Sequence, residues 1–286
     1  GLASDAEITL ELNPEDVEED LIAAYVALGV NRFSLGVQSI LDERLMHLDR
    51  GHDGARAKES IAAVRRSGVR AVSVDLMFAT PGQRASSWTE EIEAVVDLGA
   101  DHLSLYALTV EPRTRLDQLI KQGSYPSVDE EQSADLFDVA RDTLQAAGWS
   151  HYEVSSYGRP GYEAVHNRAY WHGLPYLGVG ASSHGLLHQR RWVNHRRPSR
   201  YIEEALAGRP EAQSEQITDE LWAWERVLTG LRDLDRGVDR AWLQAATGER
   251  FLEIQDQGRL EAIGSRLRVP RDHVLLLDSI LLDLAP

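Results

Sequence analysis

A short apolar strand followed by a helix-like segment occurs four times within the first 110 residues. Each strand segment ends in a polar or aromatic residue, and a turn or a helical pattern follows it. This alternation predicts parallel β-strands with helices packed outside the sheet, the arrangement of α/β proteins. The four strand segments cover residues 8–11, 33–38, 72–75 and 103–106.

The last residue of each segment is a candidate for ligand binding. In parallel α/β sheets and barrels, ligands bind at the carboxyl ends of the strands. We therefore expect Glu11, Gln38, Asp75 and Tyr106 to surround the mouth of a single pocket. Asp75 stands out, because an unpaired charge in an otherwise apolar strand is costly.

Three of these residues also have a simpler interpretation. Glu11 could be a solvated acid at a strand end. Gln38 could cap a helix instead of binding a ligand. Asp75 could form a buried ion pair with an arginine such as Arg50 or Arg70. The residues by themselves leave both interpretations open.

The alternation of strands and helices stops near residue 112. A long helix over 129–147 and a strand over 151–155 are expected next, followed by a stretch rich in glycine and aromatic residues. Toward the C-terminus the apolar spacing becomes helical, and the chain ends with a short strand or wing and a closing helix. We therefore expect a first domain over 1–218 and a small helical domain over 219–286.

The composition argues against several classes of function. The formal net charge of −16 opposes binding to nucleic acid, because lysine and arginine drive the attraction to phosphate. The chain has no cysteine, so it offers neither disulfides nor thiolate metal ligands. No apolar run reaches the ~18 residues that a membrane span needs, and no secretion signal is recognisable. These features predict a cytoplasmic protein that associates with membranes only through its partners.

A second candidate site lies in the stretch His166–Trp171, which groups an imidazole with the aromatic rings of Tyr170 and Trp171. Stacking faces together with one axial nitrogen suit a planar hydrophobic cofactor. A structural histidine beside core aromatics is the alternative, and the residues alone favour that alternative. The sequence has no phosphate-loop pattern and no GxGxxG, so nucleoside triphosphates and nicotinamide cofactors are poorly supported.

Several segments together resemble a known family over nearly the whole chain. The chain is similar to the radical S-adenosylmethionine (SAM) proteins related to oxygen-independent coproporphyrinogen III oxidase. The stretch His166-Asn167-x-x-Tyr170-Trp171 matches the motif of the haem chaperone branch, the HemW-like proteins. The segments that carry the family resemblance are residues 10–14, 31–39, 75–77 with 80–83, 103–112, 152–155 and 176–180.

The resemblance implies a partial (β/α)6 radical SAM barrel that lacks its first two βα units. It also implies a haem-binding extension around residues 150–200 and a small C-terminal helical or winged-helix-like domain. Such a protein binds a [4Fe-4S] cluster, SAM and haem, and it delivers haem to haem-requiring proteins such as respiratory enzymes. The alternative is a coproporphyrinogen III oxidase-type enzyme of porphyrin biosynthesis.

The resemblance also implies roles for individual residues. Arg50 joins the candidates because the segment around it matches a Leu-Gly-Arg-x-His pattern of the family, and a guanidinium can hold a carboxylate bidentately. Tyr106 would lie beside the adenosyl part of SAM, and His166 would bind haem. The residues expected to contact SAM directly are Glu11, Gln38, Arg50 and Asp75. Those expected to support His166 are Asn167, Tyr170 and Trp171.

Two features of the family are missing from this sequence. The CxxxCxxC loop that binds the cluster and the GGGTP segment that helps to hold SAM are both absent. The resemblance begins at the family's third strand, so we expect the cluster cysteines upstream of Gly1. A binding protein that has lost the cluster is the alternative. We expect this chain alone not to cleave SAM reductively, because no thiolate can hold the cluster.

Overall fold

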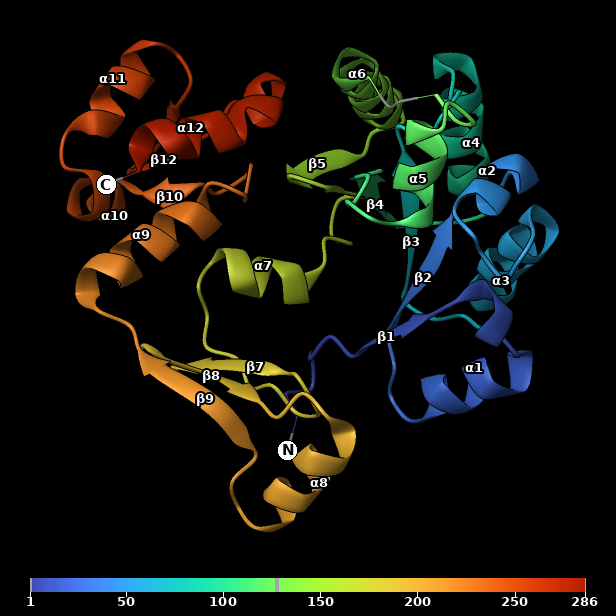
Figure 1. Ribbon diagram of the computed structural model, residues 1–286, viewed down its shortest axis with the longest axis horizontal. Helices are drawn as coiled ribbons and strands as arrows, with labels where there is room; N and C mark the ends of the chain where they lie inside the picture. Colours follow the sequence, from blue (N-terminus) through green and yellow to red (C-terminus); the bar gives the residue numbers. More distant parts are fainter. Residues whose placement is uncertain (1, 127–128, 286) are drawn as a thin grey trace. The chain divides into compact units, whose positions relative to one another are not determined.

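The computed structural model describes residues 2–126 and 129–285. The chain forms two compact units, Gly1–Ala164 and Val165–Pro286, and each is described by itself (Figure 1). This division differs from the boundary after residue 218 that the sequence suggests. The segment from α7 (Val165–Trp171) through residue 218 belongs to the same compact unit as the C-terminal helices.

A six-stranded mixed sheet forms the centre of the first unit. The strand order is β1-β2-β3-β4-β6-β5. Strands β1 to β4 are parallel, and β6 runs antiparallel to both β4 and β5. The register aligns Glu11 with Ser34 and Asp75 with Ser104, so polar side chains of neighbouring strands lie close together. The strands are β1 (Thr9–Leu12), β2 (Arg32–Gln38), β3 (Ala71–Phe78), β4 (His102–Ala107), β5 (Ser150–Glu153) and β6 (Ser156–Gly158).

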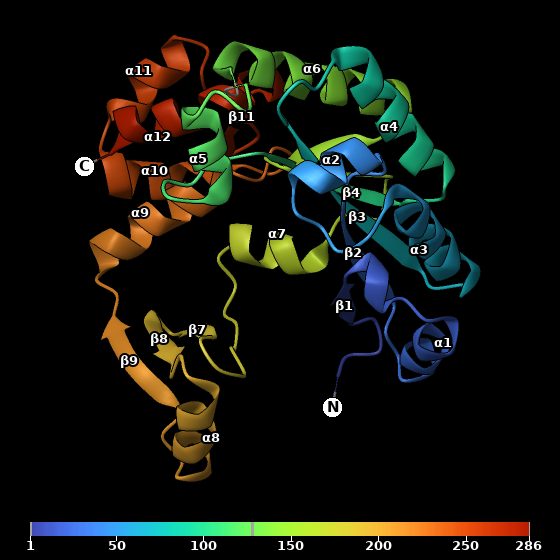
Figure 2. The same cartoon turned by 45° about the vertical axis from the view of Figure 1, so that its right-hand side comes forward.

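The two faces of this sheet differ in chemistry, because side chains alternate along each strand. On one face, Leu35, Val74 and Leu103 are fully buried, and helices cover this side of the strands (Figure 2). The alternate positions carry polar side chains, including Ser34 and Asp75. The helices of the unit are α1 (Glu19–Ala27), α2 (Asp42–His47), α3 (Gly54–Arg66), α4 (Ala85–Asp97), α5 (Arg115–Lys121) and α6 (Glu130–Ala146).

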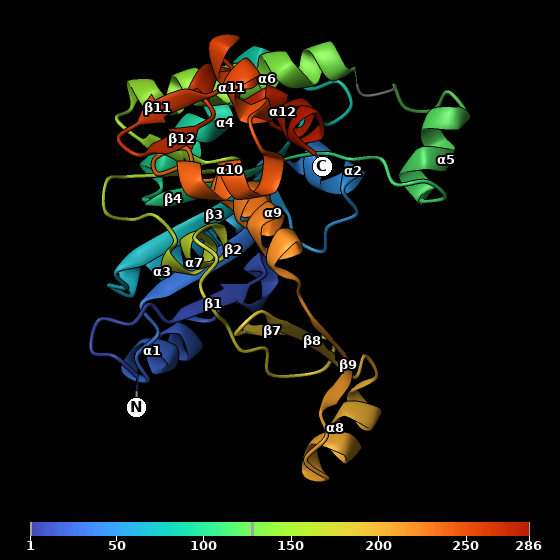
Figure 3. The same ribbon diagram turned by 90° about the vertical axis from the view of Figure 1, so that its left-hand side faces the viewer.

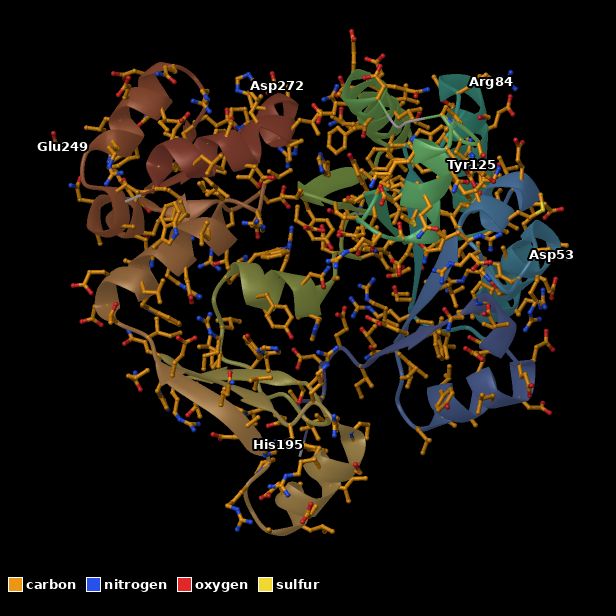
Figure 4. All side chains as sticks on the ribbon, in the orientation of Figure 1. Asp53, Arg84, Tyr125, His195, Glu249 and Asp272 are labelled. Atoms are coloured by element: carbon orange, nitrogen blue, oxygen red, sulfur yellow. The ribbon has the colours of Figure 1, made fainter. Side chains whose placement is uncertain are left out.

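Local signals explain where some of these helices begin. The Asp53 carboxylate accepts a hydrogen bond from the Arg56 N–H at 2.7 Å, and it thereby caps α3 (Figure 4). The helical segment after β1 is split into a short 3-10 helix, Pro14–Asp16, and α1. The cause is Val17, which is buried in an extended conformation and interrupts the helix.

The sequence did not predict α5 and β6. Helix α5 lies between residue 112 and the long helix expected over 129–147, and Thr114 caps it by accepting a hydrogen bond from the Asp117 N–H. Figure 3 shows α5 at the outer edge of the first unit. Strand β6 arises because the chain turns back directly after β5 and pairs with both β4 and β5. A hairpin therefore replaces the single strand that was expected over 151–155.

The second unit contains two small antiparallel sheets and most of its helices lie toward the C-terminus (Figure 3). The stretch rich in glycine and aromatic residues leads into β7, which begins at His184. The preceding loop folds tightly onto this strand, since a Cβ at Gly178 would lie 2.1 Å from the His184 carbonyl oxygen. The elements after α7 are β7 (His184–Leu187), β8 (Arg190–Asn194), α8 (Pro198–Leu206), β9 (Glu211–Gln216), α9 (Asp219–Gly230), β10 (Val238–Asp239), α10 (Arg240–Thr247), α11 (Arg250–Asp256), β11 (Glu261–Ile263), β12 (Arg266–Arg268) and α12 (Leu277–Leu284).

Buried apolar side chains from several elements form the core of the C-terminal part of this unit. Leu231 follows α9, Leu267 belongs to β12 and Ile280 belongs to α12, and each is almost completely buried. Of the helices formed by the described residues, none has the length and apolar character to cross a membrane.

Candidate functional site

The backbone at the end of β2 is irregular and turns Gln38 back over the polar face of the sheet. Gln38 has a φ of +66°, and the register between β2 and β3 shifts between Leu35 and Gln38. A Cβ at Gly36 would stand 3.3 Å from Nε2 of Gln38 and 3.5 Å from Oδ1 of Asn13. The missing side chain at Gly36 therefore leaves room for two amide groups above this strand.

Asp75 lies on the polar face of β3, between strands β2 and β4. Burial raises the pKa of its carboxyl group to about 6, and the nearby Glu11 carboxylate adds to the rise. Hydrogen bonds from the side chains of Ser104 and Ser34 act in the opposite direction. Asp75 is thus a partly buried acid whose immediate hydrogen-bond partners are neutral hydroxyl groups.

No cation among the described residues forms an ion pair with Asp75. The pairing with Arg50 or Arg70 that the sequence allowed is not formed. The Arg70 guanidinium instead contacts the backbone oxygen of Gly161 at 3.5 Å. Burying a carboxylate without a cationic partner is unfavourable, and the raised pKa of Asp75 is its consequence.

Glu11 and Tyr106 complete the group around Asp75. Glu11 is exposed on β1, and its charge raises the pKa of both Asp75 and Tyr106. Tyr106 on β4 is half-exposed, and its pKa is raised chiefly by burial and next by the Asp75 carboxylate. The Glu153 carboxylate of β5 also contributes to that rise. The fold therefore brings Glu11, Asp75 and Tyr106 together at one edge of the sheet.

This arrangement fits a small molecule that carries positive charge and an aromatic ring. A cationic ligand would relieve the repulsion between Asp75 and Glu11 and would favour the ionised form of Asp75. Gln38 offers an amide donor and acceptor above the strand end. Tyr106 offers an aromatic face that is partly open to solvent.

The described contacts of Arg50 do not connect it to the group around Asp75. Its side chain is exposed, and no hydrogen bond joins its guanidinium to another described residue. His52, two residues later, was not singled out from the sequence. Its buried ring contacts the Glu15 carboxylate at 3.0 Å and the Val37 carbonyl oxygen at 3.1 Å. His52 therefore ties the loop that carries Arg50 to the end of β2.

A buried ion pair fixes the chain immediately after Gln38. Glu91 of α4 is 2% exposed and pairs with Arg44 of α2. The Glu91 carboxylate also accepts hydrogen bonds from the Ser39 hydroxyl and, at 2.8 Å, from the Ile40 N–H. The end of β2 is thereby connected to two helices. Glu91 lies within an amphipathic helix, so in the sequence it looks like an ordinary helical acid.

Helix α7 carries the second candidate group. The ring of His166 stands edge-on to Tyr170 at 4.8 Å, and Tyr170 stands edge-on to Tyr176 at 4.7 Å. The guanidinium of Arg232 lies over the Trp171 ring at 5.8 Å. No residue of α7 is buried, and His166 is exposed, so the interpretation as a core histidine among core aromatics does not hold. Asn167, in the same helix, is partly exposed.

Charged contacts hold α7 to the turn after α9, within the same unit. Arg168 pairs with Asp235, and His172 contacts Asp233 at 2.7 Å. Asp233 is 1% exposed, and its other oxygen accepts hydrogen bonds from the N–H groups of Asp235 and Arg236. The C-terminal segment therefore helps to position the helix that carries His166. Neither His172 nor Asp233 was singled out from the sequence, because their contact spans 61 residues.

The overall sequence relationship decides the family. The Radical SAM superfamily matches residues 2–95. The heme chaperone HemW of Mycobacterium tuberculosis is 36% identical over 281 residues, which cover 98% of this chain and 72% of that protein. The chain belongs to the HemW heme chaperone family. This membership confirms the resemblance that the sequence motifs suggested.

Two further relatives extend this result. The mitochondrial radical S-adenosyl methionine domain-containing protein 1 of Bos taurus is 33% identical over 303 residues, covering 99% of this chain and 68% of that protein. The structure of coproporphyrinogen III oxidase (HemN) from Escherichia coli, a radical SAM enzyme, matches with a TM-score of 0.79 at 21% identity. That match covers 99% of this chain and 70% of the oxidase chain. The chain therefore has the α/β fold of HemN-like radical SAM proteins, with a mixed sheet and many helices.

The HemW relationship covers both candidate groups, whereas the superfamily match covers only part of one. The matched residues 2–95 include Glu11, Gln38, Arg50 and Asp75 but not Tyr106.

Sequence reasoning missed Ser34 and Ser104, the two serines that hydrogen-bond to Asp75. The sequence does contain a clue to both. Each is a polar residue between two apolar neighbours in its strand, and the two strands, β2 and β4, pair with β3 on either side.

Proposed function

We propose that this chain acts as a haem chaperone, which binds haem on α7 and delivers it to haem-requiring proteins such as respiratory enzymes. The observation that carries the proposal is the 36% identity to a heme chaperone along 98% of the chain. The geometry of α7 supports it, because an exposed imidazole beside aromatic rings suits an iron held in a flat apolar macrocycle.

In this proposal His166 provides the axial nitrogen, and the other residues support it. Tyr170 lies one helical turn after His166 and holds the edge of its ring. Trp171 supplies apolar surface next to the site, and Asn167 supplies an amide that can donate to or accept from the ligand. Haem would supply the iron centre, and the task of this chain's own residues would be to hold the haem and to release it.

The test is a titration of haem into the protein and into the His166→Ala variant, followed by absorbance. We expect the variant to bind haem more weakly and to show a changed haem spectrum, because an axial nitrogen has been removed. His195→Ala is the matched control, since it removes one imidazole from the region of α8 (Figure 4). Equal affinity and identical spectra for the protein and His166→Ala would contradict the role of His166.

We also propose that the strand-end group of the first unit binds SAM. Asp75 and Glu11 would face the positively charged part of SAM, Gln38 would hydrogen-bond to it, and Tyr106 would lie beside the adenosyl part. Arg50 would reach the methionine carboxylate from its exposed loop. Two neighbouring carboxylates without a cation support this assignment. Equilibrium dialysis should show weaker SAM binding for Asp75→Asn, and unchanged binding for the exposed control Asp97→Asn.

The radical SAM superfamily implies a [4Fe-4S] cluster in addition to SAM, but the residues of this chain do not fit a cluster. The sequence has no cysteine. Within residues 2–126 and 129–285, no group of three His, Cys, Asp or Glu side chains could hold a metal ion. We therefore propose that this chain alone does not cleave SAM. Formation of 5′-deoxyadenosine after iron–sulfur reconstitution and reduction would contradict this proposal.

The alternative function is that of a porphyrinogen oxidase. The E. coli oxidase shares the fold at a TM-score of 0.79, but its 21% identity supports the fold alone. The higher identity to HemW favours the chaperone. Anaerobic incubation with coproporphyrinogen III, SAM and a reductant distinguishes the two functions. Release of two carbon dioxide molecules for each product, with formation of vinyl groups, would favour the oxidase.

The proposed function is associated with a more specific fold for each part of the chain. We propose that the parallel strands β1 to β4 are part of a (β/α)6 barrel, and that residues 219–286 form a winged-helix-like domain. The three-stranded sheet β10-β12-β11 beside α10 and α11 supports the second assignment. Limited proteolysis is the test. Early cleavage next to residue 218 would support the proposed boundary, and early cleavage next to residue 164 with an intact remainder would contradict it.

A further inference from the structure

Arg226 is a buried arginine to which no carboxylate of the described part of the chain is hydrogen-bonded. It belongs to α9 and is 8% exposed. Its guanidinium lies over the ring of Trp222 at 4.1 Å. Its Nε and Nη1 atoms have no hydrogen-bond partner among the described residues. A buried cation is costly unless an anion or good hydrogen bonds compensate for the lost hydration.

The acid whose charge acts on Arg226 is already engaged with another arginine. The Glu225 carboxylate acts on Arg226 through its charge, but its hydrogen-bonded partner is Nη1 of Arg191 at 2.8 Å. Arg190 shows the ordinary situation in the same unit. It also lies over a tryptophan ring, that of Trp192 at 5.4 Å, yet its guanidinium is paired with Glu211. Both arginines thus stack on a tryptophan ring. Arg226 differs from Arg190 because no described carboxylate is hydrogen-bonded to its guanidinium.

The chain is built around the guanidinium of Arg226. Gly173 has a φ of +66°, and a Cβ at this position would lie 0.9 Å from Nη1 of Arg226. Only a residue without a side chain leaves room for the guanidinium there. Gly173 and Trp222 both lie against the guanidinium, and both also line a cavity of about 470 Å³. Its remaining lining residues are Pro175, Leu186, Leu187, His188 and Gln189.

The cavity has the size and chemistry of a small-molecule site. Ligand pockets span roughly 300–1,000 Å³ and combine apolar walls with a few polar groups. A series of rings leads from here to the proposed haem ligand. Tyr176 interacts electrostatically with Arg226, it packs edge-on against Tyr170, and Tyr170 packs against His166. All of these residues belong to the second unit.

We propose that Arg226 binds a carboxylate of the ligand that His166 holds. This inference rests on the proposed function, under which the ligand is haem and the carboxylate is one of its propionates. Haem combines a flat apolar body with two carboxylates, and the second unit offers an apolar cavity beside one uncompensated cation. A guanidinium can bind a carboxylate through two parallel hydrogen bonds. The missing partner of Arg226 is thereby explained as the ligand itself.

The experiment uses metal-free porphyrins, so that iron ligation does not contribute. Protoporphyrin IX and its dimethyl ester differ only in whether the two propionates are ionisable. Both are titrated at the same detergent concentration, and the measured quantity is the ratio of the two dissociation constants. We expect the protein to prefer the free acid by about tenfold to hundredfold, the range of a charge-assisted hydrogen bond.

Three variants locate the origin of this preference. Arg226→Met should bring the ratio close to one. Gly173→Ala keeps the charge but displaces the guanidinium, and it should reduce the ratio in the same direction. Arg190→Met is the matched control, because it removes a stacked arginine that is already paired with Glu211, and it should keep the ratio. A ratio that is unchanged in Arg226→Met would overturn the proposal.

The same series separates this proposal from the proposed function. His166→Ala should keep the preference for free protoporphyrin IX over its dimethyl ester. With haem, the same variant should lose the spectrum of haem whose iron is bound by histidine. A protein that binds haem but shows no preference for the free acid would overturn the assignment of Arg226 alone. A protein that binds neither haem nor protoporphyrin IX would overturn both proposals.

Discussion

The two units of this chain each contain a charge that the described chain leaves uncompensated, and the charges have opposite signs. In the first unit Asp75 lies near Glu11, and its hydrogen-bond donors among the described residues are the neutral hydroxyl groups of Ser34 and Ser104. In the second unit Arg226 lies on Trp222 without a hydrogen-bonded carboxylate. The difference indicates a cationic ligand for the first unit and an anionic ligand for the second. SAM and haem have these respective charges.

A third buried charge shows what a purely structural role looks like. Glu91 is as deeply buried as any of these groups, yet Arg44, Ser39 and Ile40 satisfy its carboxylate. Such a network stabilises the fold, and the Glu91 carboxylate is already engaged by partners within the protein. The comparison therefore predicts that removing a paired charge destabilises the protein, whereas removing an uncompensated one stabilises it in the absence of ligand.

The largest expected effect belongs to Glu91. Glu91→Ala should lower the free energy of unfolding by about 3–5 kcal/mol, because it leaves the Arg44 guanidinium buried without its partner. Urea unfolding followed by circular dichroism measures this change. The exposed neighbour provides the control, and Glu90→Ala should change stability little. If both variants were equally stable, the structural role of the Glu91 network would be disproved.

Asp75 should behave in the opposite way. Its pKa rises from 3.8 to about 6 on folding, which corresponds to up to about 3 kcal/mol of lost stability once the pH exceeds both values. Asp75→Asn should therefore be more stable than the parent protein at pH 7.5. The gain should shrink as the pH falls through 6 and should vanish below about 4, where the carboxyl is protonated in both states. A gain that does not depend on pH would contradict this explanation.

Arg226→Met should stabilise the ligand-free protein by a smaller amount. Replacing an unsatisfied buried group by an apolar one of similar length removes a penalty of about 1–3 kcal/mol. Thermal unfolding without ligand measures this gain. Arg190→Met, in which a satisfied ion pair is broken, should show no gain. A less stable Arg226→Met would mean that the guanidinium has a structural partner.

The smallest expected effect concerns the start of the helix that carries Arg226. The Thr218 hydroxyl accepts a hydrogen bond from the Leu221 N–H at 3.3 Å. Thr218→Ala should cost about 1 kcal/mol of stability, whereas Thr218→Ser should keep the cap. The porphyrin preference should be retained in both variants, since the guanidinium remains in place. Loss of that preference in Thr218→Ala would show that Arg226 depends on the helix start.

The first unit was largely predictable from the sequence because its signals are local. Alternating apolar residues define the strands, and the parallel order then places Glu11, Asp75 and Tyr106 at one end of the sheet. The hairpin of β5 and β6 was missed, because two short strands separated by two residues look like one. The alternative partners suggested for Asp75 were wrong, since the chain contains many arginines and spacing does not determine which one is close.

The second unit was less predictable because its key contacts are distant in the sequence. Gly173 and Arg226 meet only through the fold, and so do His172 and Asp233. Arg226 lies in a helix where an arginine is common, so its burial leaves no trace in the spacing. Strands β8 and β9 were missed for another reason, because β8 begins with two arginines and β9 is made almost entirely of polar residues. The motif around His166 was visible only because its residues are adjacent.

His52 makes two segments of the first unit depend on a single side chain. One ring nitrogen contacts the Val37 carbonyl oxygen in β2, and the other contacts the Glu15 carboxylate in the 3-10 helix that follows β1. The ring is buried between these two partners. Replacing His52 by alanine should therefore loosen both segments at once. Faster hydrogen exchange of the backbone amides in both segments is the measurement that detects this.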